Sequence, residues 1–280
     1  MNITPEMVKE LRRRTGIGVG KCKEALVEAG GDIETAIANL RKAGMASAVK
    51  KEGREIKEGM IAHAKGKSAI AVVEIGAETD FVVQNERFQA FAKEVAQVAA
   101  DQAIDSLETL IKARSTSDPS MTLDELRAST IQSLGENIQI SRIKLHKVAS
   151  GHSVAIYSHM GGKIVTVIDL KGSDQEEALA REVAMHAAAE APEYLTPDEI
   201  PADVKAKEEE IARGQIQNKP REIQDKIVQG KLEAFYAQVC LPRQKFVKDP
   251  SVTIQQLIEK RAKEGGKPLS LAGFIRWSIE

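Results

Sequence analysis

The sequence has 280 residues, of which 42% are hydrophobic and 29% are charged. This composition is typical of a folded protein of about two domains and excludes a disordered chain. The 40 Lys and Arg residues are balanced by 41 Asp and Glu residues, so the chain lacks the overall positive field that holds a phosphate backbone. We therefore expect no direct nucleic-acid partner.

The two cysteines, Cys22 and Cys240, are far apart in the sequence and form no metal-ligand pair. Such cysteines are typical of a reduced compartment, and we expect both to be small buried apolar groups. No apolar run approaches the ~18 residues that span a bilayer, and no signal peptide is found. The sequence therefore predicts a cytoplasmic protein without a membrane segment.

Residues 1–55 are predicted to form a helical N-terminal module with its linker. Thr4 and Pro5 begin a first helix that ends at Gly16, and Gly30 ends a second helix. Asp32 caps a third helix, which Gly44 is expected to end. The charged residues 46–58 indicate a linker or a solvated helix.

The glycine-rich stretch TGIGVGKCKEAL invites comparison with a phosphate-binding loop. A P-loop needs a glycine five positions before its Gly-Lys pair and a hydroxyl residue after it, but Thr15 and Cys22 occupy those positions. Lys21 also stands where a dinucleotide fingerprint has its third glycine. We therefore predict a turn between helices and no bound cofactor.

From residue 59 the pattern changes to strand-like alternation and repeats itself. Residues 61–75 align with residues 156–170 at an offset of 95, and both halves read as a hairpin. The helices that follow, residues 92–96 and 180–184, align at an offset of 88. The first half thus has seven extra residues between strand and helix, since 95 − 88 = 7.

Those extra residues fall in a stretch that contains Glu78 to Val83, where an apolar triplet follows Asp80. An enlarged apolar connection on a rigid scaffold is a candidate contact site. In the alternative, Phe81 folds back into the core together with Phe88 and Phe91. The second half makes its connection through a compact turn, for which Ser173 and Glu176 predict a capping box.

Other elements surround the repeat. Thr122 and Glu125 predict a capping box that opens a helix, and residues 138–148 are strand-like. Two charged helical stretches, residues 203–217 and 221–239, flank Asn218-Lys219-Pro220 and predict a helical hairpin. This hairpin is either a solvated excursion or an arm for homodimerisation or another partner. The final GFIRWSI is strand-like.

The sequence offers little that indicates enzymatic chemistry. The histidines have no HExxH spacing and neighbour no recognised nucleophile motif. We expect His186, within the apolar AMHAAA stretch, to be a core histidine with satisfied hydrogen bonds. No carboxylate pair has the context of a general acid and base, so we predict a protein that is not an enzyme and binds no metal.

Several strings in chain order together resemble the bacterial elongation factor Ts family. They are LRRRTGIGVGKCKEAL (11–26), ETDFV (78–82), MHAAAEAP (185–192), KPREI (219–223) and FVKDPSVTIQQLI (246–258). The resemblance extends from the N-terminus to the end of the chain. It implies a translation factor that promotes nucleotide exchange on the GTPase elongation factor Tu.

The resemblance also implies an α+β fold. It comprises a three-helix ubiquitin-associated-like module, a two-part core of duplicated hairpin-helix units, and an inserted antiparallel coiled-coil hairpin. The expected boundaries are 1–55 for the module and linker, 56–140 for the first half of the core, 141–188 with 232–280 for the second half, and 189–231 for the hairpin. Some relatives continue with a C-terminal helical module, which we expect to be absent here.

The resemblance assigns partner-facing residues in three places. In the loop Thr79-Asp80-Phe81-Val82, the phenylalanine wedges between helices of the GTPase and the aspartate helps to disturb its magnesium and phosphate site. His159 and Gly161 lie in a hairpin turn that meets the barrel portion of elongation factor Tu, or form a plain glycine turn.

In the helical module the expected partner-facing residues are Val19 and Gly20, where many relatives carry larger apolar side chains.

As an alternative function we consider an RNA- or ribosome-associated binding protein. It would use the basic residues Arg12, Arg13, Arg14, Lys50 and Lys51.

Overall fold

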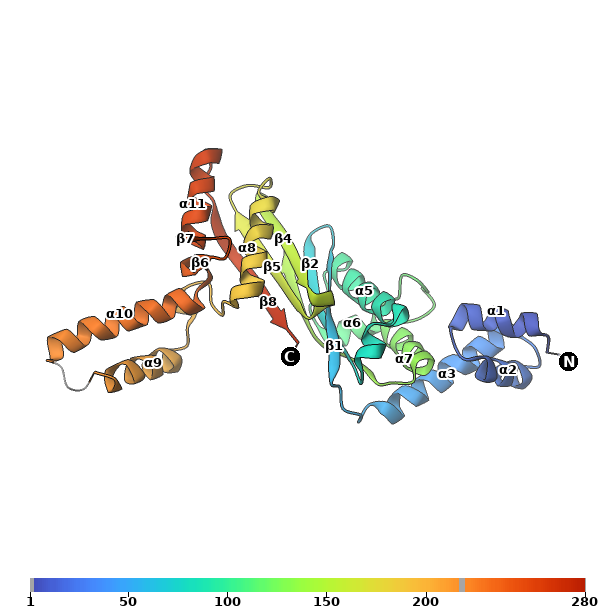
Figure 1. Ribbon diagram of the computed structural model, residues 1–280. Coiled ribbons are helices and arrows are strands. Elements are labelled where there is room, and N and C mark those ends of the chain that lie inside the picture. Colours follow the sequence, from blue (N-terminus) through green and yellow to red (C-terminus); the bar gives the residue numbers. More distant parts are fainter. Residues whose placement is uncertain (1–2, 217–219, 280) are drawn as a thin grey trace. The chain divides into compact units, whose positions relative to one another are not determined.

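The computed structural model describes residues 3–216 and 220–279. These residues form two compact units, residues 3–147 with residue 279, and residues 148–278. Each unit contains a three-stranded antiparallel sheet with a long helix on one face (Figure 1). The fold is therefore of the α+β class. Within the described ranges, no helix is both long and apolar enough to cross a membrane.

The N-terminal module consists of three helices, α1 (Pro5–Thr15), α2 (Val19–Glu28) and α3 (Ile33–Lys51). The predicted caps are present, since Thr4 Oγ1 accepts from Met7 N at 3.3 Å and Asp32 Oδ1 accepts from Thr35 N at 2.7 Å. The small core of the module is formed by apolar side chains from all three helices, among them Leu11, Cys22, Leu26, Ala36 and Leu40.

Helix α3 does not end at Gly44, contrary to the prediction. It continues to Lys51, and its second half packs on α7. A Cβ at Gly44 would lie 3.1 Å from Gln132 Oε1 and 3.4 Å from the Ala128 carbonyl oxygen. Gly44 therefore permits close approach of two helices and is not a stop signal.

The rest of unit 1 is built on a sheet with strand order β1-β2-β3, in which both pairs are antiparallel. Helix α5 packs on one face of this sheet, where its Phe88 and Val95 join Val73 and Ile75 in the core. The elements are β1 (Glu58–Lys65), β2 (Ala69–Ala77), α4 (Asp80–Val83), α5 (Glu86–Asp101), α6 (Leu107–Lys112), α7 (Leu123–Leu134) and β3 (Ile138–Lys147).

Unit 2 repeats this plan with strand order β4-β5-β8, and helix α8 packs on β4 and β5. The elements of the repeated part are β4 (His152–His159), η1 (Met160–Gly162), β5 (Ile164–Lys171), α8 (Glu177–Glu190) and β8 (Ser270–Ser278). Between α8 and β8 lie η2 (Pro197–Glu199), α9 (Ala202–Gly214), α10 (Arg221–Val239), η3 (Leu241–Arg243), β6 (Lys245–Phe246), β7 (Asp249–Thr253) and α11 (Ile254–Gly265).

The repeat includes the third strand of each sheet. The pairing of β2 with β3 shifts register between Glu74 and Ile75, and the pairing of β5 with β8 shifts between Asp169 and Leu170. Both shifts occur at the same place, since 74 + 95 = 169. A shared irregularity at the matching position indicates that the two units are copies of one three-stranded design.

The first strands of the two hairpins align differently from the prediction. Ala64 pairs with Ala71 and Tyr157 pairs with Thr166, and Ala71 matches Thr166 at the offset of 95. Ala64 therefore matches Tyr157 at an offset of 93. The partners are seven residues apart in unit 1 and nine in unit 2, so the second hairpin is two residues longer at its tip.

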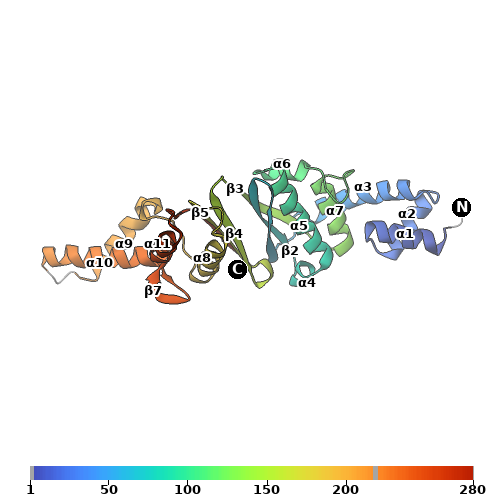
Figure 2. The same ribbon diagram turned by 90° about the horizontal axis from the view of Figure 1, so that it is seen from above.

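Two boundaries differ from those drawn on the sequence. The units divide after Lys147, because β3 pairs along its whole length with β2, whereas the sequence placed the division at residues 140 and 141. The helix predicted over residues 221–239 is α10 and ends at Val239, so the expected end of the hairpin at residue 231 cuts through it. Helices α9 and α10 contact each other (Figures 1 and 2). Of the predicted connection between them, Asn218 and Lys219 lie outside the described residues.

The two predicted capping boxes have different outcomes. The Thr122–Glu125 box is present at the start of α7. The Ser173–Glu176 box is absent, because α8 begins only after Glu176 and has no side-chain cap. Ser153 Oγ instead accepts from the Glu176 backbone N–H at 2.7 Å, and the Glu176 carboxylate pairs with Arg261 at 2.8 Å. A tertiary contact thus replaces the local motif.

Candidate partner-binding site

The connection between β2 and α5 contains a short helical turn, which is held by hydrogen bonds to the segment before β3. Thr79 caps α4, and its backbone N–H and hydroxyl donate to the two carboxylate oxygens of Glu136 at 3.0 and 2.7 Å. The neighbouring Glu78 carboxylate accepts from the Asn137 backbone N–H at 2.6 Å and pairs with Arg54 at 3.3 Å. The segment before β3 therefore holds both ends of the Glu78–Thr79 step in place.

Adjacent residues of α4 lie in opposite environments. Val82 is 7% exposed and joins the core of unit 1, whereas Phe81 is 82% exposed. Because successive residues of a helix point about 100° apart, a buried Val82 directs Phe81 away from the core. The alternative that Phe81 plugs the core is therefore wrong, whereas Phe88 and Phe91 are core residues.

Val82, which we included among the partner-facing residues, is buried and anchors α4 to the core. Asp80 is exposed in the first turn of that helix. The turn thus presents one carboxylate and one aromatic ring on a support of hydrogen bonds. The corresponding connection in unit 2, residues 172–176, contains no helix.

In the helical module, Val19 and Gly20 lie in the first turn of α2, where Val19 is 52% exposed. Val27, two turns further along the helix, is 60% exposed. Val19, Lys23 and Val27 are spaced four residues apart and lie on one face of α2. The sequence analysis missed Val27, although its i, i+4, i+8 spacing with Val19 and Lys23 could have revealed it.

The tip of the second hairpin presents His159 and Met160. The Tyr157 hydroxyl lies 3.2 Å from His159 Nδ1, and the two rings stack with their centroids 6.0 Å apart. Met160 is 70% exposed and has a φ of 49°. Gly161 also has a positive φ, of 66°, in open space. The exposed Met160 is a further residue that the sequence analysis missed.

Among the described residues, no group of three or more His, Cys, Asp or Glu side chains is placed to hold a metal ion.

The predicted core role of His186 is confirmed. The ring is fully buried, its Nε2 lies 3.0 Å from Gln244 Oε1, and its Nδ1 accepts from the Val247 backbone N–H at 3.2 Å. Burial lowers the pKa of His186.

The basic residues near the helical module are largely engaged within the chain. Arg13 pairs with Glu10 at 2.7 Å and Arg14 with Glu34 at 2.6 Å. Lys51 Nζ donates to the Ile131 carbonyl oxygen at 3.4 Å, and burial lowers the pKa of its ammonium group. These contacts reduce the positive charge that the module presents to a polyanion.

The described residues form an α+β protein with a duplicated core and exposed apolar side chains on its turns, and comparisons with known proteins specify its family. Residues 78–280 match the family described as Elongation factor TS. A protein of Protochlamydia amoebophila named Elongation factor Ts is 54% identical over 277 residues, which cover 99% of this chain and 98% of the relative. Proteins of the same name from Chlamydia trachomatis serovar L2 and Chlamydia caviae are 45% and 44% identical, over 98% and 99% of this chain and 97% and 99% of the relatives. The chain belongs to the elongation factor Ts family and is thus a translation elongation factor.

Proposed function

We propose that this protein binds elongation factor Tu and promotes the exchange of GDP for GTP by disturbing the magnesium and phosphate site of that GTPase. The observation that carries the proposal is the 82% exposure of Phe81 on a turn that is held by Glu136 and Asn137. Burying a phenylalanine side chain that was exposed contributes about 1.5–3 kcal/mol. A rigid, exposed ring is therefore an economical anchor for a protein partner.

Exchange requires a contact that differs between two states of the GTPase. A factor that binds the nucleotide-free state more tightly than the GDP-bound state weakens nucleotide binding by the same coupling free energy. Insertion of Phe81 between helices of the GTPase supplies such a contact, since it favours the state in which those helices are displaced. Asp80 adds a negative charge beside the ring, which opposes the phosphates and competes for the magnesium ion.

The other exposed residues widen the proposed interface. Val19 and Gly20, with Val27 on the same helix face, form the contact of the helical module. His159, Met160 and Gly161 form a second contact through the hairpin tip. Thr79 and Val82 act within the chain, as the cap and the buried anchor of α4.

The alternative of an RNA-binding function receives less support. Arg13, Arg14 and Lys51 make contacts within the chain, and the formal net charge is −1. An RNA complex would weaken steeply with salt because bound counterions are released, whereas an apolar wedge would not.

We place the protein in the cytoplasm, together with the translation machinery. Both buried cysteines are free thiols, which agrees with a reduced compartment.

Release of a fluorescent GDP analogue from elongation factor Tu, followed by stopped flow, tests the proposal. We expect substoichiometric amounts of the protein to accelerate release, and raising the salt concentration from about 0.1 M to about 0.3 M to weaken the effect only modestly. Unchanged release at saturating protein would refute the exchange function. Tight, steeply salt-dependent binding to RNA would favour the alternative.

A further inference from the structure

The C-terminus of α1 meets the rest of unit 1 through its backbone carbonyl groups. The last carbonyls of a helix lack partners within the helix and carry its negative dipole end. Here the Arg87 guanidinium donates to the Thr15 carbonyl oxygen through Nη1 at 3.5 Å, a long hydrogen bond. Ser133 Oγ donates to the Gly16 carbonyl oxygen at 3.0 Å. A cation from α5 and a hydroxyl from α7 thus satisfy the end of α1.

Gly16 is the residue that admits this arrangement. It ends α1 with a φ of +70°, and its own N–H bonds back to the Arg12 carbonyl. A Cβ at this position would lie 1.6 Å from Arg87 Nη1, so the guanidinium rests directly on the glycine. A side chain here would displace Arg87, which is flexible and exposed, and would also add backbone strain.

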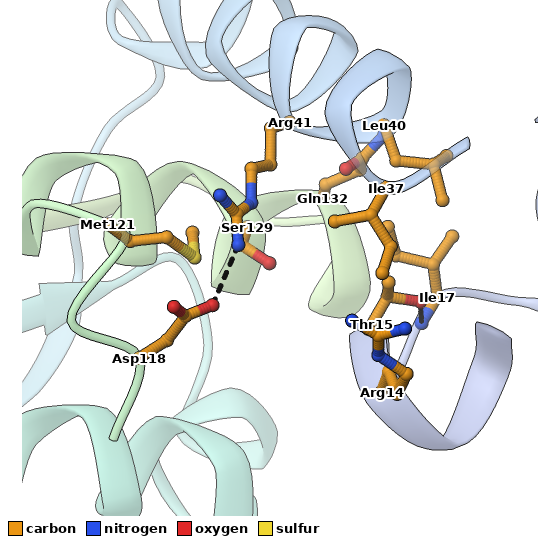
Figure 3. Close-up of a pocket in the computed structure, with 10 residues that line it drawn as sticks. All are labelled: Arg14, Thr15, Ile17, Ile37, Leu40, Arg41, Asp118, Met121, Ser129 and Gln132. Carbon is orange, nitrogen blue, oxygen red and sulfur yellow. Dashed lines mark hydrogen bonds and ion pairs between the residues drawn. The ribbon is translucent and has the colours of Figure 1, made fainter. Parts of the chain in front are cut away.

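A small cleft beside this contact shows how the module and the core of unit 1 meet (Figure 3). Its volume is about 80 Å³, and Ile17, Ile37 and Met121 contribute apolar walls. Arg41 of α3 pairs with Asp118 across it at 2.7 Å. The loop that carries Asp118 is itself fixed, because Glu94 of α5 accepts from the backbone N–H groups of Thr116 and Ser117 at 2.8 and 3.0 Å.

Arg87 also belongs to the segment that carries the exposed ring. It lies in the first turn of α5, two residues after the Asn85 cap that separates this helix from α4. Residues 81–87 therefore hold Phe81 at one end and the guanidinium that contacts α1 at the other. If the helical module moved relative to α5, the position of the module relative to Phe81 would change as well.

We propose that Arg87, seated on Gly16, is a positioning residue that holds the helical module at a fixed place beside the Phe81 turn. The partner then meets α2 and Phe81 as one prearranged surface, and binding does not have to order two separately moving parts. This inference rests on the proposed function for its consequence in binding. The positioning itself is a property of the chain alone.

The test compares Arg87→Ala, Gly16→Ala and the double variant with Gly30→Ala as a matched control. Gly30 lies in the same module with a φ of +59°, and a Cβ there would meet no atom within 4 Å. Gly30→Ala therefore introduces similar backbone strain without touching Arg87. Because Arg87 is exposed, its truncation does not threaten the fold, so Arg87→Ala remains informative should Gly16→Ala fold poorly.

The first measurement needs no partner. Spin labels on Lys23→Cys in α2 and Gln84→Cys after α4, in a background with Cys22→Ala and Cys240→Ala, report the distance between module and turn. We expect one narrow distance distribution for the parent chain and for Gly30→Ala, and a broader one for Arg87→Ala and Gly16→Ala. A distribution that stays equally narrow without Arg87 overturns the positioning role.

The second measurement is GDP release from elongation factor Tu against the concentration of each variant. Loss of prearrangement should raise the half-saturating concentration about tenfold while the maximal rate at saturation is retained. The double variant should exceed Arg87→Ala only by the small factor seen for Gly30→Ala. A reduced maximal rate with unchanged half-saturation, or broader distances with unchanged half-saturation, overturns the inference. If the parent chain fails to accelerate release, the proposed function fails, and the distance measurement still decides whether Arg87 positions the module.

Discussion

Buried polar and thiol groups show at the residue scale how burial sets chemical behaviour in this chain. Cys22 is fully buried in the helical module, and its Sγ lies 3.3 Å from the Ile17 carbonyl oxygen. His186 is fully buried in unit 2 and uses both ring nitrogens in hydrogen bonds. Both groups are held in their uncharged forms, since an apolar environment opposes charge.

Cys22 should react slowly with a thiol reagent in the native protein. Burial raises the pKa of its thiol, so little thiolate is present at neutral pH, and the sulfur is covered. Cys240 is buried and its pKa is raised for the same reason. A colorimetric thiol assay should therefore detect two reactive thiols promptly in denaturant and almost none without it. Immediate native labelling of Cys22 in a folded sample would contradict the packing of the module.

The stability of the fold should decrease as the pH falls below about 6.5. Burial lowers the pKa of His186, and also that of His63, below the ordinary value of 6.5. The unfolded chain therefore binds protons at a higher pH than the native chain does. The stabilisation is complete above the unfolded pKa and is lost as the pH falls toward the native pKa.

Urea unfolding at about pH 7.5 and about pH 5.5 measures this effect. We expect a lower urea midpoint at the acidic pH, and a smaller difference between the two conditions for His186→Asn. That variant should be less stable at both values, because Gln244 Oε1 loses its partner at His186 Nε2. A midpoint that is unchanged or higher at the acidic pH would rule out a neutral buried His186.

The elements show which structural features a sequence determines locally. Thr4, Asp32 and Thr122 were predicted as helix caps and are caps, because each accepts from a backbone N–H three residues away. Gly44 and Ser173 were predicted wrongly, because contacts with Ala128 and Ser153 decide their roles. Signals that act within one helical turn could be predicted, whereas those set by distant packing could not.

The helical hairpin is attached to unit 2 through a small cluster at its base. Ile200, Val239 and Cys240 are buried there, with Tyr194 and Phe235 packed against them. The Glu193 and Tyr194 backbone N–H groups both donate to the Val239 carbonyl oxygen, at 2.9 and 3.1 Å. The base is thus part of the fold of unit 2, and the outer part is a separate pair of helices.

Replacing residues 208–231 by a short glycine-rich linker should leave a folded protein that still stimulates GDP release. The deletion removes the Arg213–Asp225 contact between α9 and α10 but keeps the cluster at the base. Circular dichroism and the release assay should show a cooperative melt and a stimulated rate within a few-fold of the parent. Complete loss of stimulation in a well-folded deletion variant would show that the outer hairpin is essential.

The whole molecule is a duplicated design with one addition in each copy. The connection between strand and helix is longer in unit 1, where it carries Phe81, and the hairpin tip is longer in unit 2, where it carries His159 and Met160. The first addition could be predicted from the alignment of the two halves. The second could not, because only the pairing of Tyr157 with Thr166 reveals the true register.

The exposure of Phe81 was likewise undecided by the sequence. A phenylalanine beside two valines fits a core as well as a surface. The choice depends on two hydrogen bonds between residues far apart in the sequence, from Thr79 to Glu136 and from Asn137 to Glu78. Those contacts fix α4 with Val82 inward. The central claim is that this arrangement presents Phe81 to the GTPase.

The rate of GDP release from elongation factor Tu with Phe81→Ala tests that claim most directly. Truncating an interface anchor costs about 2 kcal/mol or more, which corresponds to a roughly thirtyfold slower stimulated release. Because Phe81 is exposed, the Tm of the Phe81→Ala variant should be nearly the same as that of the parent protein. Phe88→Ala, which empties a core position, should instead destabilise the fold by about 3–5 kcal/mol. Val247 is an exposed apolar residue in unit 2, so Val247→Ala should change neither the release rate nor the Tm. Normal stimulation of release by a folded Phe81→Ala variant would contradict the account.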